Sequence, residues 1–168
     1  MCPPSGGSAA PGELDDRGQR VGRVLGNEHE LVTRKARLRI SGAGASFAEP
    51  PVLELEGEFD MDTVPEIDRF LRRSLGPLYH RGHLVIDLAT TTFVDSTFIA
   101  FLVRLFGQQR AGQRELMLAR PVGQVRRALG LVGLPNVVPV FESVVDAVGI
   151  LASGSVPVIP PAFSVKGR

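Results

Sequence analysis

The chain contains very little cysteine and lysine, and this narrows the chemistry that it can perform. Its 168 residues include a single cysteine, Cys2, so neither an internal disulfide nor a cysteine-based zinc site can form. The three histidines show no HxxxH spacing, which argues against a helical zinc site. Lys35 and Lys166 are the only lysines, and neither follows the GxxxxGK[ST] loop of a nucleotide-binding P-loop. We expect no cofactor.

Long apolar runs and an excess of one charge are also missing. The most apolar run, residues 98–106, is interrupted by Arg104, whereas a membrane-crossing helix needs about 20 apolar residues. Residues 1–30 lack the apolar stretch of a secretory signal. Basic residues number 19 and acidic residues 18, so nothing attracts the chain generally to nucleic acid or to an anionic membrane. We therefore expect a cytoplasmic protein that binds neither directly.

Composition divides the chain into three parts. Residues 1–30 are rich in glycine, proline, alanine and serine and then in charge, without an apolar period, which predicts a disordered N-terminal leader. Residues 153–168 contain several prolines and glycines and are predicted to form a flexible tail. The remaining residues, 31–152, have the length of one ordinary domain.

The middle part predicts a compact α/β domain with the order β-β-α-β-α-β-α-β-α. Strands are expected around residues 38–40, 52–56, 83–88, 115–119 and 137–140, and helices around 63–78, 96–109, 122–131 and 144–151. The first two strands alternate apolar and charged residues, which favours an antiparallel hairpin at the edge of the sheet. The crossover helices imply a mixed sheet.

Local patterns add three expectations to this outline. Thr63 and Glu66 have the spacing of a capping box at the start of the first helix. Residues 90–95 are predicted to be a loop. The helix from Ser96 is apolar on most sides, so we expect it to be largely buried.

The segment Phe93–Phe98, with the sequence FVDSTF, is the most informative one. Asp95, Ser96 and Thr97 are all good residues for the first turn of a helix, where side-chain oxygens accept from free backbone N–H groups. The same position also suits a phosphate on Ser96, because the N-terminus of a helix is positive and offers backbone donors. Such a phosphate would add about −1.5 to −2 charges at neutral pH. The residues alone leave both interpretations open.

Three motifs make the chain resemble the anti-sigma-factor antagonist family, the STAS domains. The GEFD sequence at residues 57–60 is similar to the GELD segment of that family. The VIDL strand at residues 85–88 and the later FVDST resemble the family's strand and its phosphoacceptor DS[ST]G loop. Residues 125–134, VRRALGLVGL, resemble the helix and Gly-Leu turn before the last strand. The likeness extends from about residue 37 to residue 151.

This resemblance implies a role for particular residues. Ser96 matches the serine that is phosphorylated by the partner, an anti-sigma factor that is a serine kinase of the GHKL type. Asp60 and Asp95 match the two acidic positions beside it, although Asp95 could equally serve to hold the loop. Thr97 matches the neighbouring hydroxyl and is expected to cap the helix. Family members are not catalysts: they bind the anti-sigma factor when unphosphorylated, and the sigma factor is freed.

Phe98 departs from the family pattern, which has glycine there. Its ring either turns into the core, which leaves the switch intact, or blocks the approach of a partner. The second case favours an alternative function, a STAS scaffold or homo-oligomeric module, such as a homodimer, that is not phosphorylated. A third hypothesis is a small enzyme that uses Glu58, Asp60 and Asp95 around a metal ion.

Charge is distributed unevenly along the domain. Residues 49–68 contain eight acidic residues and no basic one, whereas residues 104–127 contain six arginines and one acid. Such runs form either a solvated face or an oriented docking surface.

Overall fold

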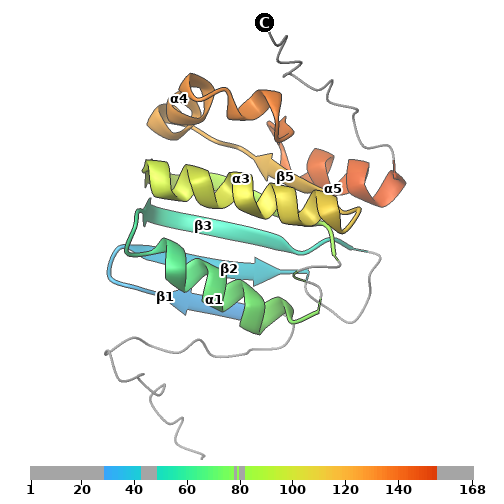
Figure 1. The fold of residues 1–168 in the computed structure, drawn as a ribbon, viewed down its shortest axis with the longest axis horizontal. Coiled ribbons are helices and arrows are strands. Elements are labelled where there is room, and N and C mark those ends of the chain that lie inside the picture. The colour runs from blue at the N-terminus through green and yellow to red at the C-terminus, as the bar shows by residue number, and fades with distance from the viewer. Residues whose placement is uncertain (1–28, 43–48, 78, 80–81, 155–168) are drawn as a thin grey trace, which may run out of the picture.

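A computed structural model describes residues 29–42, 49–77, 79 and 82–154 of the chain, which form one α/β domain around a six-stranded mixed sheet (Figure 1). The predicted fold class is confirmed. The strands are β1 (His29–Val32), β2 (Ala36–Ser41), β3 (Val52–Phe59), β4 (Leu84–Val94), β5 (Leu116–Ala119) and β6 (Val140–Phe141). The helices are α1 (Val64–Leu75), α3 (Ser96–Ala111), α4 (Gly123–Leu131), a 3-10 turn (Leu134–Asn136) and α5 (Val144–Ser153).

The β2–β3 hairpin follows directly from the alternating sequence. Leu38 lies opposite Leu55 and Ile40 opposite Leu53 in an antiparallel register, and all four are fully buried. The charged residues between them point to the other face. One strand was not predicted: β1, only four residues long and half exposed, pairs antiparallel with β2 and extends the hairpin outward.

Strands β3 to β6 are parallel, and the strand order β1-β2-β3-β4-β5-β6 follows the sequence. Helices α1, α3 and α4 make the crossovers between them. The carboxyl ends of four neighbouring strands therefore meet at one edge of the sheet. In open α/β sheets this edge is where ligands and partners commonly bind.

Strand β4 is longer than expected, because it continues to Val94 through the segment predicted as a loop. The hydroxyls of Thr90 and Thr91 both donate to the carbonyl of Leu55, at 3.1 and 2.9 Å. The β3–β4 ladder shifts register twice near these threonines. These polar residues stay in the sheet because the carbonyl of Leu55 in β3 accepts from their hydroxyls. The strand therefore runs on to Val94, and Asp95 lies directly between it and α3.

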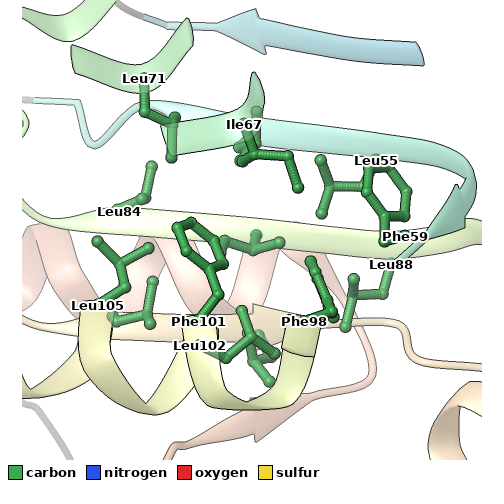
Figure 2. Close-up of a cluster of buried hydrophobic side chains, with 14 of the residues drawn as sticks. Leu55, Phe59, Ile67, Leu71, Leu84, Leu88, Phe98, Phe101, Leu102 and Leu105 are labelled. Atoms are coloured by element: carbon green, nitrogen blue, oxygen red, sulfur yellow. The ribbon is translucent and has the colours of Figure 1, made fainter. Parts of the chain in front are cut away.

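Two apolar clusters cover the two faces of the sheet. The larger one packs α1, α3 and α4 against strands β2 to β5, and Figure 2 shows its centre, where side chains of α1 and α3 meet those of β3 and β4. The smaller one packs Ala147 and Leu151 of α5 against Val85, Met117 and Ala119 on the opposite face. The sheet is therefore packed on both faces, with α3 on one face and α5 on the other.

Helix α3 is buried on one face rather than on most sides. Phe98, Phe101, Leu102 and Leu105 lie in the core, but Val103 is 47% exposed. Its exposed side includes small residues that read as apolar in the sequence, which is why the pattern suggested deeper burial. No helix in the described part of the chain is long and apolar enough to span a membrane.

The predicted leader and tail fall mainly outside the described residues. Nearly all of the leader, residues 1–28, and most of the tail, residues 155–168, lie beyond them. At the domain's ends the first strand begins at His29 and the last helix ends at Ser153. The boundaries at residues 31 and 152 stay a prediction.

Candidate functional site

Asp95 fastens together the two loops that leave β3 and β4. Its Oδ1 accepts from the backbone N–H of Phe98 at 2.9 Å and so caps α3. Its Oδ2 accepts from the N–H of Met61 at 3.1 Å, in the loop after β3. Its own N–H donates to the carbonyl of Phe59 at 3.2 Å. Asp95 therefore holds the loop, and the cap that was expected from Thr97 comes from Asp95 instead.

Ser96 is the first residue of α3 and is exposed, as is Thr97. Ser96 directly follows Asp95, whose carboxylate accepts from the N–H of Met61 in the β3–α1 loop. Asp60 directly precedes Met61. The structure thus brings the loops of Asp60, Asp95 and Ser96 to one place. A negative group added to Ser96 would stand at the positive end of a 16-residue helix.

Phe98 turns into the core, the first of the two alternatives that the sequence left open. Its side chain is 0% exposed. The ring centroid lies 5.4 Å from that of Phe59 and 6.2 Å from that of Phe101 (Figure 2). Both are distances at which tilted aromatic rings attract each other. Phe98 therefore contributes no surface to a partner and does not cover the neighbouring Ser96.

Asp60, and not Thr63, organises the start of α1. Asp60 Oδ1 accepts from the N–H groups of Asp62 and Thr63 at 3.1 and 3.2 Å, the pattern of an Asx turn. The hydroxyl of Thr63 is turned back and accepts from the N–H of Asp60 at 2.8 Å. Thr63 makes no capping bond of its own, so the capping box predicted with Glu66 is wrong. The same hydroxyl also donates to the carbonyl of Asp60 at 3.1 Å, so it is engaged with Asp60 and not with the free N–H groups of α1.

Lys35 belongs to this site, although nothing in the motif analysis selected it. Lys35 lies in the turn between β1 and β2, and its ammonium is 2.7 Å from Asp60 Oδ2 and 3.7 Å from Asp62 Oδ2. The hydrogen bond with Lys35 is the main cause that lowers the pKa of Asp60 below its ordinary value. The same bond raises the pKa of Lys35. In the sequence, only the scarcity of lysine drew attention to Lys35, and it did not show which carboxylate the ammonium would bind.

Gly57 in the GEFD motif is required by the approach of this same turn. Its φ is +98°, a backbone conformation that residues with a side chain rarely adopt. A Cβ built on it would lie 2.2 Å from the carbonyl oxygen of Lys35. That oxygen accepts from the N–H of Glu58 at 3.0 Å. The glycine thus lets the β1–β2 turn close on β3, and this places the Lys35 ammonium beside Asp60.

Many members of the two charge runs pair with each other or with nearby groups. Asp68 lies 2.8 Å from Arg72 and 3.7 Å from Arg104, joining the acidic run to the arginine run. Other pairs are Arg37–Glu56, Arg110–Glu115, Arg120–Asp87 and Arg126–Glu142. These contacts show that part of the uneven charge is neutralised within the fold, so the runs by themselves do not mark a docking surface.

The metal-dependent alternative finds no ligand set. Within residues 29–42, 49–77, 79 and 82–154, no group of three or more histidine, cysteine, aspartate or glutamate side chains is arranged to hold a metal ion. Asp60 and Asp95 instead use their carboxylates on Lys35 and on backbone N–H groups.

Comparisons with known proteins agree with this architecture. A family model described as STAS domain matches residues 37–147. An anti-sigma factor antagonist from Mycobacterium paratuberculosis is 20% identical, with a TM-score of 0.55 over 71% of this chain and 97% of that one. SpoIIAA, an anti-sigma factor antagonist solved in its unphosphorylated form, is 19% identical, with a TM-score of 0.53 over 71% of this chain and 99% of that one.

A third structure has the same fold. An anti-sigma-factor antagonist (STAS) domain protein from Planctomyces limnophilus is 18% identical, with a TM-score of 0.54 over 68% of this chain and 97% of that one. Comparison with the curated proteins finds no significant match. At these identities the structural matches establish the fold alone, whereas the family model covers most of the domain.

Proposed function

The chain belongs to the STAS domain family, and on that premise we propose that it is an anti-sigma-factor antagonist switched by phosphorylation of Ser96. Unphosphorylated, it binds an anti-sigma factor, a serine kinase of the GHKL type, and the sigma factor is set free. Phosphorylated, it releases the anti-sigma factor, which captures the sigma factor again. The chain itself acts by binding rather than by catalysis, and it works in the cytoplasm, where transcription is controlled.

The observation that carries this proposal is the exposed Ser96 at the start of α3, beside the loop of Asp60. A kinase must reach the hydroxyl, and the burial of Phe98 leaves it uncovered. In the transfer, the Ser96 oxygen forms a bond to the γ-phosphorus of ATP, the bond to ADP breaks, and the hydroxyl proton passes to a base that the kinase supplies. The antagonist contributes a held, accessible acceptor.

Electrostatics explains why the phosphate would break the complex and not the fold. A partner acid about 5 Å from a doubly charged phosphate is repelled by roughly 2 kcal/mol in water and about 6 kcal/mol at an effective dielectric of ~20. That is tenfold or more in affinity. Within the fold, by contrast, the N-terminus of a helix attracts an anion, which stabilises the phosphorylated domain by about 0.3–1 kcal/mol. The start of α3 therefore tolerates the charge that a partner would not.

Phosphorylation tests the acceptor assignment. Purified GHKL-type serine kinases from the same genome are incubated one by one with the protein and ATP, and the intact mass is measured. We expect one of them to add a single phosphate, Ser96→Ala to abolish it, and the matched control Thr97→Ala to retain it. Equal labelling of Ser96→Ala and the unmodified sequence would show that the acceptor is another residue.

Binding tests the switch. Ser96→Asp is expected to weaken the complex with that kinase at least about tenfold. It should leave the thermal midpoint nearly unchanged, because an acid suits the first turn of a helix. The burial of Phe98 removes one of the two reasons for a non-phosphorylated scaffold, and the apolar sequence of residues 98–106 is the other.

A further inference from the structure

Three large apolar side chains are exposed at the edge of the sheet where Ser96 lies, and we call them the apolar rim. Met61 is 68% exposed, Phe93 42% and Val122 49%. Each lies within three residues of the carboxyl end of one strand: Met61 after β3, Phe93 in the last residues of β4, and Val122 after β5. Because β3, β4 and β5 are parallel neighbours, the rim lies along the same sheet edge as Ser96.

Hydrogen bonds hold the outer members of the rim to the strand that carries the central one. The N–H of Met61 donates to the side chain of Asp95, directly after β4. On the other side, the side-chain amide of Gln124, in the first turn of α4, donates to the carbonyl of Thr92. Both loops are therefore fixed to the end of β4, one on each side of it. Hydrogen bonds therefore fix the positions of the loops that carry the rim.

Several charges along this edge are paired within the chain. Lys35 binds Asp60 at 2.7 Å. Arg120, directly after β5, donates from Nε to the buried carboxylate of Asp87 in β4 at 3.0 Å. Farther along, Arg126 of α4 pairs with Glu142 after β6. A partner that met this edge would find much of its charge already balanced, so the complementary surface is an apolar one with little net charge.

We infer that the apolar rim is the docking surface of the kinase that phosphorylates Ser96, and that docking is driven by apolar burial. The inference deepens the proposed function and rests on it. The occupant follows from position, because a protein that reaches the Ser96 hydroxyl must cover the side chains beside it. Excluding water there also lowers the local dielectric, so that a phosphate on Ser96 repels the partner more strongly than it would on a wet surface.

The test compares rim variants with a matched control on the same domain. Met61→Ser, Phe93→Ser and Val122→Ser each remove one rim side chain. Leu131→Ser is the control, since Leu131 is 82% exposed but lies at the far end of α4. The probe is the purified kinase that labels Ser96, and its affinity for each variant is measured by calorimetry at low and high salt. Thermal melting checks that each variant is folded.

We expect each rim variant to weaken binding, the strongest about tenfold or more, and Leu131→Ser to bind as the unmodified chain does. High salt should leave the affinity nearly unchanged, because apolar contacts are not screened by ions. Met61→Ser keeps the test decisive if Phe93→Ser melts early, since Met61 is the more exposed of the two.

Other outcomes would overturn the inference. Equal affinity of all variants, with Ser96 still labelled, would place docking elsewhere while the acceptor assignment stands. A large loss of affinity at high salt would show that the contact is ionic. Self-association in sedimentation that only the rim variants lose would assign the rim to a second copy of this chain. If no kinase labels Ser96, the proposed function fails first and takes the inference with it.

Discussion

Replacing Phe98 by alanine tests whether the residue that departs from the family pattern is a core residue. Its side chain is fully buried between the rings of Phe59 and Phe101. Truncating a buried phenylalanine costs about 3–5 kcal/mol, the lost transfer free energy plus the cavity left behind. The total stability of a domain is about 5–15 kcal/mol, so this loss would be a large share of it. At about 4 °C per kcal/mol, the thermal midpoint should fall by about 12–20 °C.

Urea unfolding followed by circular dichroism measures this change. Phe98→Leu refills most of the space and should cost about 1–1.5 kcal/mol. Thr97→Ala is the matched control, one residue earlier and exposed, and should change stability by no more than about 0.5 kcal/mol. A Phe98→Ala protein within about 1 kcal/mol of the unmodified chain would refute the reasoning, because a ring packed on two others cannot be removed so cheaply.

Three further substitutions follow from the contacts of the site. Asp95→Ala removes the cap of α3 and should cost about 0.5–2 kcal/mol in urea unfolding, while Asp95→Asn, which keeps one acceptor oxygen, should cost less. Gly57→Ala forces a Cβ to 2.2 Å from a carbonyl at positive φ and should cost at least about 2 kcal/mol, whereas Gly107→Ala, in open space on α3, should stabilise by about 0.5–1 kcal/mol; similar effects would contradict the close approach. Lys35→Met should raise the pKa of Asp60 in a carbon-13 carboxyl titration. A carboxyl whose pKa is lowered in the fold stabilises the fold above its ordinary pKa, and this stabilisation is lost as the pH falls through the lowered value. The unmodified chain should therefore be more stable than Lys35→Met at neutral pH, and the difference should vanish in strong acid.

Much of the fold could be predicted because its signals are local. The alternation around Leu38 and Leu55 predicted the β2–β3 hairpin, and the apolar stripe that includes Ile67 predicted α1. Strand β1 was missed because it is short and half exposed, so no clear alternation marks it. The end of β4 was misread as a loop because its threonines are polar, and only their bonds to the carbonyl of Leu55 keep them in the sheet.

The residues of the candidate site could be selected from motifs in the sequence, but their contacts could not. The hydroxyl of Ser96 and the carboxylates of Asp60 and Asp95 stand in a recognisable order along the chain. The direction of the Phe98 ring depends on Phe59, which is distant in sequence, so the sequence left it open. The partner of Lys35 is 25 residues away, and a single lysine in a turn carries no local sign of the carboxylate that it will meet.

The double use of Asp95 has a consequence for how a partner is received. One carboxylate binds the starts of two segments, so we expect the backbone around residue 96 to be ordered before a partner binds. Complex formation then has little backbone entropy to lose, and the ordering that remains is that of a few side chains, about 0.5–1.5 kcal/mol each. We expect the partner to bind a surface that already has its bound conformation, with a residence time set by the dissociation rate.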